Sequence, residues 1–214
     1  MSHTKMGTTM YRVIWPKNKK TFIEYLAGLV YGDGQIEKYR ITITDQYKEF
    51  LDEVAKRIKD LMEVEPKLHR RKGYDVWYMR IYGKDVVETI RNKISELYGN
   101  PTTNFIRGFF DAEGTIYIDN GYIIIEFDQK DPAILANIAN SLYDRCIYTR
   151  IRRREYFDKR PNKNKLYVKY ELRIKRKTSV YRFLNKIGLR HIKHITIISS
   201  FYSHAPSPPV GRQG

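Results

Sequence analysis

The feature that most constrains this chain is an apolar, glycine-containing segment that occurs twice. The first copy, from Phe22, reads FIEYLAGLVYGDGQI, and the second, from Asn104, reads NFIRGFFDAEGTI. Each copy contains an acidic residue followed by glycine, Asp33 in the first and Glu113 in the second. A repeat of this spacing is too long for a solenoid unit, and it fits two diverged copies of a small αβ subdomain within 214 residues.

The residues after each copy repeat as well. In the first half, strand-like alternation in YRITIT runs into an amphipathic helical pattern, and YIIIEF does the same in the second half. Aligning the apolar positions pairs Asp45 with Gln129 and Gln46 with Lys130. The second half needs four extra residues, which we place in its first hairpin around Asp119-Asn120-Gly121, because Asn-Gly favours tight turns.

Two hairpins and three helices complete the pattern. We expect hairpin turns near Lys72-Gly73 and Pro161-Asn162, a helix over about 21–34 in the first copy, and later helices over 84–98, 178–187 and 191–203. The sequence therefore predicts an α+β fold of two pseudo-symmetric αββαββα halves with antiparallel sheets. The expected boundaries are an N-terminal extension 1–20, a first half 21–100, a second half 101–203 and a disordered C-terminal tail 204–214.

The net charge of +16 indicates a polyanionic partner. Most of it lies between Arg150 and Lys177, where thirteen Lys or Arg residues oppose three acids. From Lys165 to Lys175, apolar residues alternate with mainly cationic ones, which predicts a strand with one face on the core and one face toward nucleic acid. A solvated basic face, as on a ribosomal protein, would explain the charge equally well.

The cysteine content and the apolar runs restrict the compartment. Cys146 is the single cysteine, which excludes an internal disulfide and the usual thiolate zinc sites. No apolar run has the length of a membrane span or the form of a signal peptide. We therefore expect a soluble cytoplasmic protein with no membrane partner.

The two apolar segments predict a pair of packed helices. Gly28 and Gly32 share one helical face, and Gly108 and Ala112 occupy the same places in the second copy. Small residues at this spacing let two helix backbones approach closely, so the acids at both C-terminal ends should emerge together. A cation would relieve two carboxylates placed where the helix dipole already disfavours negative charge. Hard oxygen ligands near a phosphate-seeking surface favour Mg²⁺ over zinc.

These residues resemble a known family. Leu26 to Gly34, LAGLVYGDG, closely resembles the signature of the LAGLIDADG homing endonucleases, and Ile106 to Gly114, IRGFFDAEG, looks like its second copy. Two copies in one chain resemble the monomeric, archaeal-like, intron-encoded branch of the family. The resemblance implies two four-stranded sheets that form a saddle over DNA, with the paired motif helices on the pseudo-twofold axis.

The resemblance also implies a site and a reaction. Asp33 and Glu113 would bind divalent ions, helped by the backbone carbonyls of Gly32 and Ala112. Mg²⁺ is the expected cofactor; Mn²⁺ should replace it, and Ca²⁺ should bind without supporting cleavage. Water would hydrolyse one phosphodiester per strand of a long double-stranded target and leave 3′ overhangs. The polar residues expected to orient water or stabilise charge at the edge of the centre are Asp45, Gln129, Lys130 and Lys193.

Two motif positions depart from the family pattern. Tyr31 stands at the sixth position, which is usually acidic, and Arg107 stands at the second, which is usually small. Neither position carries the metal, so the departures bear on packing more than on chemistry.

Outward residues of the expected strands should face the major groove, where Arg reads guanine and Glu accepts from cytosine. Because these residues differ between the halves, we expect an asymmetric target. The expected DNA-contacting residues are Gln35, Glu37, Arg40, Thr42, His69, Arg71, Tyr78, Arg80 and Tyr82 in the first half, and Thr115, Tyr117, Glu126, Arg152, Arg154, Lys169, Glu171, Arg173 and Lys175 in the second.

The main alternative is nucleic-acid binding without cleavage, as an intron maturase with host intron RNA as partner or as a DNA-binding regulator. Retention of both acids favours the nuclease, because a regulator freed from catalysis could lose either carboxylate. A structural RNA-binding protein would explain the charge but not the paired acidic helices.

Overall fold

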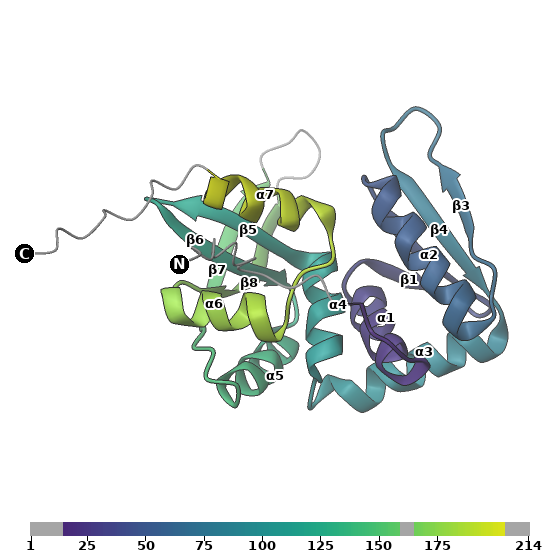
Figure 1. The fold of residues 1–214 in the computed structure, drawn as a ribbon, viewed down its shortest axis with the longest axis horizontal. Helices are drawn as coiled ribbons and strands as arrows, with labels where there is room; N and C mark the ends of the chain where they lie inside the picture. The colour runs from purple at the N-terminus through teal and green to yellow at the C-terminus, as the bar shows by residue number, and fades with distance from the viewer. Residues whose placement is uncertain (1–14, 159–164, 204–214) are drawn as a thin grey trace, which may run out of the picture.

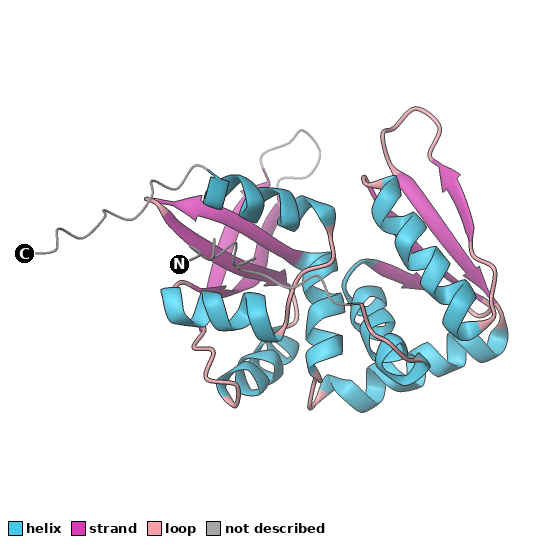
Figure 2. Ribbon diagram, viewed as in Figure 1, coloured by secondary structure: helices cyan, strands magenta, loops and turns pink. Residues whose placement is uncertain are grey.

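We describe the protein from a computed structural model, which describes residues 15–158 and 165–203 (Figure 1). The predicted α+β architecture is confirmed: two repeated halves each contain a four-stranded antiparallel sheet with helices packed on it (Figure 2). The first half consists of α1 (Lys19–Asp33), β1 (Gly34–Ile36), β2 (Arg40–Asp45), α2 (Lys48–Met62), β3 (Lys67–Arg70), β4 (Trp77–Tyr82) and α3 (Lys84–Tyr98).

The second half repeats this order and adds one helix. It consists of α4 (Thr103–Glu113), β5 (Gly114–Asp119), β6 (Tyr122–Gln129), α5 (Pro132–Tyr143), β7 (Arg150–Asp158), β8 (Lys165–Ile174), α6 (Lys177–Lys186) and α7 (Ile192–Ser203). The strand orders are β1-β2-β4-β3 and β5-β6-β8-β7. Ile41 pairs with Ile81 in the first sheet as Ile125 pairs with Ile174 in the second, so the repeat extends to the strand register.

The helix α1 begins and ends slightly earlier than predicted. We expected residues 21–34, but the Asn18 side chain accepts the Thr21 amide at 3.0 Å and caps the helix there. Trp15 packs edge-on against Tyr25, so part of the predicted extension 1–20 contacts the first half. The other residues of that extension, 1–14, the predicted tail 204–214 and the predicted turn at Pro161-Asn162 lie outside the described residues.

The turn at Asn120-Gly121 forms as predicted. Asn120 has φ of 51° and Gly121 has φ of 78°, the left-handed backbone that a two-residue hairpin turn needs. It accounts for the longer first hairpin of the second half.

The two halves meet through α1 and α4, which lie side by side at the centre of the molecule (Figure 1). A Cβ added to Gly28 would collide with the Phe105 carbonyl, and one added to Gly108 would collide with the Tyr25 carbonyl. Close backbone approach at these glycines therefore allows the helix pair, as the small-residue spacing predicts.

Each half has its own apolar core, and the motif helices contribute to both. Ala27 of α1 packs in the core of the second half, whereas Ala112 of α4 packs in the core of the first. Phe22, Phe105 and Phe109 are fully buried, and burial of such a side chain stabilises a fold by roughly 1.5–3 kcal/mol. This packing fixes the relative position of α1 and α4, and therefore the position of the residues at their C-terminal ends. Among the described helices, none combines the length and apolar character needed to cross a membrane.

Candidate functional site

The acidic residues of the two motifs lie at the same end of the central helix pair. Asp33 is the last residue of α1 and Glu113 is the last residue of α4. The following glycines leave the helix in extended conformation, and their amides donate to the Val30 and Phe110 carbonyls. A Cβ on Gly32 would lie 3.1 Å from the Glu113 Cγ, so Glu113 lies against the last turn of α1.

The surroundings raise the pKa of both carboxyls. Burial raises the pKa of Glu113 to about 7, and the negative charges of Asp33 and Asp128 add to the effect. Burial also raises the pKa of Asp33, although part of this residue stays exposed, and Asp45 acts in the same direction. Two carboxylates that repel each other and are poorly hydrated favour a bound cation.

Two lysines oppose this concentration of negative charge. Lys193, in the first turn of α7, lowers the pKa of both Asp33 and Glu113, so its ammonium lies within electrostatic range of both. Lys130 follows β6 and lowers the pKa of Glu113. The structure therefore brings Lys193 and Lys130 to the acids.

The remaining predicted site residues occupy different surroundings. Asp45 ends β2, and its Oδ2 lies 2.8 Å from the His191 Nε2. The Gln129 side chain accepts the Lys130 amide at 2.8 Å. Gly32 and Ala112 directly precede the acids, where their carbonyls are near the helix ends. Their chemical roles stay predictions.

Sequence reasoning missed three residues of this region. Asp128 on β6 faces Glu113, while Asp111 and His191 are buried beside the helix pair. Asp111 holds the sixth motif position, which Tyr31 holds in the first copy. The presence of an acid at this position in one copy alone was the signal that could have identified it. His191 carried no signal, because it lies in a loop whose position depends on the tertiary fold.

The two departures from the motif pattern have packing roles. The Tyr31 hydroxyl donates to Asp131 at 3.2 Å. The buried Arg107 donates to the Ile187 carbonyl and, at 2.9 Å, to Asn104. Both side chains thus join a motif helix to the second half without reaching the acids.

The outward face of the first sheet carries a cationic and aromatic surface. His69 stacks on Tyr78 with ring centroids 5.2 Å apart, and the Arg80 guanidinium lies 4.8 Å from the centroid of the same Tyr78 ring. The other predicted contact residues here are exposed or half-buried; they are Gln35, Glu37, Arg40, Thr42, Arg71 and Tyr82. Glu37 pairs with Arg40.

The second sheet presents an ion-pair cluster, which we define as Glu126, Glu171, Arg154, Lys169 and Arg173. Glu171 is 2% exposed, and its carboxylate lies 2.9 Å from Arg154, 3.0 Å from Arg173 and 3.4 Å from Lys169. Glu126 is also buried and pairs with Arg173.

We expected both glutamates to stand free on the outward face. They do not, because the long cationic side chains of neighbouring strands fold over them. Their role as base contacts stays a prediction. Oxygens of Glu126, Glu171 and Asp128 lie within 4.8 Å of one another, but the cations supply the compensating charge.

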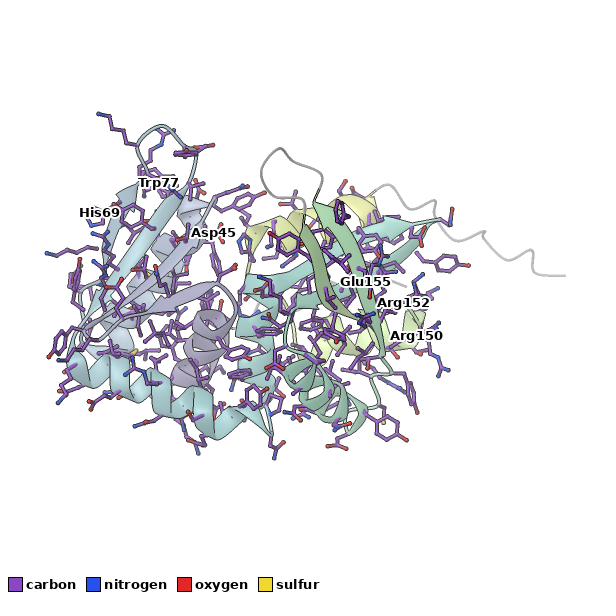
Figure 3. All side chains as sticks on the ribbon, turned by 180° about the vertical axis from the view of Figure 1, so that it is seen from behind. Asp45, His69, Trp77, Arg150, Arg152 and Glu155 are labelled. Carbon is purple, nitrogen blue, oxygen red and sulfur yellow. The ribbon has the colours of Figure 1, made fainter. Side chains whose placement is uncertain are left out.

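The remaining predicted contacts of the second half are exposed or half-buried. These residues are Thr115, Tyr117, Arg152 and Lys175. Figure 3 shows Arg150 and Arg152 along β7 and places Asp45 nearer the second half than His69. The site thus lies between two sheets whose outward faces are rich in cations.

Comparison with known proteins agrees with this geometry. The LAGLIDADG-like domain family matches residues 22–95 and 100–188. Curated protein sequences gave no match. The structure is similar to I-DmoI in complex with DNA and Mn, with a TM-score of 0.59 and 20% identity over 82% of this chain and 100% of that chain.

Two further structures share the fold. I-DmoI in complex with DNA and Ca has a TM-score of 0.57 and 19% identity over 90% of this chain and 96% of that chain. Full-length DUF199/WhiA from Thermatoga maritima has a TM-score of 0.60 and 15% identity over 92% of this chain and 65% of that chain. The family match falls once on each half and includes both acid-bearing helices. The chain therefore belongs to the LAGLIDADG-like domain family.

Proposed function

We propose that this protein is a metal-dependent, site-specific DNA endonuclease that cuts both strands of a long asymmetric target. The observation that carries the proposal is the meeting of Asp33 and Glu113 at the ends of two packed helices, between two cation-rich sheet faces. The similarity to I-DmoI, a homing endonuclease with structures in complex with DNA and Mn or Ca, supports it.

The residues present fit a hard divalent ion. Two carboxyls with raised pKa, exposed Asp33 and half-buried Glu113, supply oxygen ligands and excess negative charge, and the Gly32 and Ala112 carbonyls lie beside them. Asp33 and Glu113 would hold Mg²⁺; Mn²⁺ would replace it, and Ca²⁺ would bind without cleavage. When bound, the ion lowers the pKa of water and stabilises charge on a phosphate.

The chain's own groups then position the substrate. The outward cations of both sheets bind the phosphate backbone and orient the scissile bonds over the helix ends. Lys193 places positive charge near both acids, where it stabilises the added charge of a reacting phosphate, and Lys130 does so near Glu113. One phosphodiester per strand is hydrolysed, leaving 3′ overhangs. We further propose a monomeric, intron-encoded enzyme that acts in the cytoplasm.

The second candidate function is nucleic-acid binding without cutting. The match to DUF199/WhiA favours it, because this fold also occurs outside the proteins named as endonucleases. A maturase with host intron RNA as partner or a DNA-binding regulator would keep the sheet faces and have no need of the acids.

A cleavage selection separates the two functions. The purified protein is incubated with DNA carrying randomised long sites, in Mg²⁺ and in EDTA, and the cut ends are sequenced. The nuclease predicts metal-dependent double-strand cuts at one asymmetric sequence, absent in Asp33→Asn and Glu113→Gln. Site-selective binding with no cut in Mg²⁺ or Mn²⁺ would favour the binding function.

A further inference from the structure

The link between α6 and α7 is buried at the junction of the two halves. We call residues Leu189 to His191 the strap. Leu189, Arg190 and His191 are 0%, 4% and 0% exposed, whereas most connecting segments run over the surface. Figure 2 shows this link as a loop that passes the end of the central helix pair. A buried polar loop at this place needs specific partners.

The first anchor of the strap is Asp111 on α4. Its Oδ1 accepts the backbone amides of Arg190 at 3.2 Å and His191 at 3.1 Å. Its Oδ2 accepts the Tyr25 hydroxyl of α1 at 2.9 Å. Asp111 therefore ties the strap to both motif helices.

The second anchor lies in the other half. The His191 Nε2 lies 2.8 Å from the Asp45 Oδ2, and the His191 ring stacks on Phe50 with centroids 4.3 Å apart. The Tyr47 ring lies perpendicular to the same ring with centroids 5.1 Å apart, and the Tyr47 amide donates to the Asp45 Oδ1 at 2.7 Å. The strap belongs to the second half, yet its histidine is held by three residues of the first.

The hydrogen bonds assign the histidine tautomer. The Lys193 amide donates to the His191 Nδ1 at 3.2 Å, so this nitrogen accepts. A neutral ring then carries its proton on Nε2 and donates to Asp45. Both oxygens of Asp45 are engaged, one by His191 and one by the Tyr47 amide.

We propose that His191 is the positioning residue that holds Lys193 within reach of both acids, and that Asp45 serves the reaction by anchoring His191. The inference rests on the proposed endonuclease function. Lys193 follows His191 by two residues and lies in the first turn of α7. The hydrogen bond from the Lys193 amide to the His191 ring caps this turn, so His191 fixes where Lys193 lies. Because the charge of Lys193 lowers the pKa of both Asp33 and Glu113, loss of the strap should slow cleavage of both strands.

The alternative role for Asp45, orienting water on one strand, predicts a different outcome. Single-turnover cleavage of a target labelled on each strand is measured for His191→Ala, Asp45→Ala and the double variant, with DNA affinity measured in Ca²⁺. The strap predicts that each single change slows both strands at least tenfold with affinity within twofold, and that the double variant is no slower than the slower single variant. Slowing of one strand alone by Asp45→Ala, or multiplicative effects in the double variant, would overturn it.

Two further variants separate positioning from stability. His194→Ala removes another buried histidine, which packs on Phe110 and on the His191 ring with centroids 5.7 Å apart, but makes no hydrogen bond to the first half among the described residues. It should lower the melting temperature and keep the cleavage rate within threefold. His191→Gln, whose amide can donate to Asp45 from near the Nε2 position, should cut faster than His191→Ala. Equal slowing in His194→Ala and His191→Ala would contradict positioning.

A measurement without cleavage tests the strap if the wild-type protein does not cut. Lysines are labelled with ¹³C-methyl groups, and the Lys193 signal is assigned by its loss in Lys193→Arg. Glu113→Gln should shift this signal in the wild-type background but not in Asp45→Ala or His191→Ala. If the wild type does not cut but the Lys193 signal behaves in this way, the endonuclease is refuted and the strap is not. If Glu113→Gln shifts the Lys193 signal in Asp45→Ala and His191→Ala as much as in the wild type, the strap is refuted.

Discussion

The outward faces of the two sheets place different chemistry on matching backbone positions. In the first half, Tyr78 is a platform for His69 and Arg80, and Arg80 has no carboxylate partner among the described residues. At the matching positions of the second half, Glu171 is buried beneath Arg173 and its neighbours. Cations held by an aromatic face keep their charge for phosphate, whereas cations held by carboxylates have part of it compensated.

The motif helices differ in the same way. The sixth position is Tyr31 in the first copy, where the side chain is half-buried and bonds to Asp131. It is Asp111 in the second copy, fully buried with three donors. A duplicated backbone thus preserves the place of each side chain, while the groups available nearby decide its chemistry.

The largest difference in stability effect between the halves should come from substitutions at this sixth position. Asp111→Ala leaves the Tyr25 hydroxyl and two strap amides without their acceptor, so we expect a loss of about 3 kcal/mol in the free energy of unfolding. Tyr31→Phe removes one partly exposed hydrogen bond and should cost about 0.5–1 kcal/mol. Urea denaturation of both variants measures the difference, and equal losses would break the comparison.

The ion-pair cluster gives the next largest effect. Glu171→Ala leaves Arg173, with its side chain 11% exposed, short of one partner, so we expect destabilisation by about 2 kcal/mol. Tyr78→Ala at the matching position removes a half-buried ring and should cost about 1 kcal/mol. Thermal unfolding of the pair checks this, and a larger loss at Tyr78 would show that the cluster is not a structural unit.

The two acids should differ in their effect on stability against pH. The pKa of Glu113 rises from 4.5 in the unfolded chain to about 7 in the folded protein, so the folded state binds this proton more tightly. Without metal, the contribution of Glu113 to stability should therefore fall as pH rises from 4.5 to about 7. Glu113→Gln should remove this loss, a gain on the order of 1 kcal/mol at pH 8 after solvent screening.

Asp33→Asn is the matched control for that measurement. The pKa of Asp33 is also raised, but less, so its substitution should remove a smaller part of the pH dependence. Melting temperatures from pH 4 to pH 8 in EDTA distinguish the variants. A difference in melting temperature between the wild type and Glu113→Gln that stays constant through this range would contradict the burial of Glu113.

The smallest expected effect is on how DNA affinity depends on salt concentration. Each phosphate neutralised contributes about 0.9 to the slope of log affinity against log salt concentration. Arg80→Ala should reduce the slope by about this amount, and Arg173→Ala by less because Glu126 and Glu171 already compensate its charge. Binding in Ca²⁺ at several salt concentrations measures both. Equal changes would show that the carboxylates release Arg173 on DNA.

Local periodicity explains which parts of the fold were predictable. The limits of α3 and the turn at Asn120-Gly121 matched expectation, because amphipathic spacing and turn chemistry are local properties. The approach of Asp33 and Glu113 was predictable because Gly28 and Gly108 repeat at matching places. Sequence alternation also assigned Glu171 to the outward face of β8, but it could not show that Arg154 and Arg173 would cover it.

The strap was beyond sequence reasoning for a physical reason. His191 meets Asp45 and Asp111 only after two halves far apart in the chain have folded and packed. A polar loop has no periodicity from which such contacts can be inferred. Lys193 was a candidate by family resemblance, whereas the groups that hold it were visible only in the structure.

The most direct test of the account is strand-resolved cleavage of the selected target by wild-type protein, Asp33→Asn and Glu113→Gln, in Mg²⁺ and in EDTA. The account predicts cuts in both strands by the wild type in Mg²⁺ alone, and at least a hundredfold slower double-strand cleavage in each variant with DNA binding retained. Unchanged cleavage in both variants, or none by a wild type that binds its site, would contradict a shared acidic centre at the helix ends.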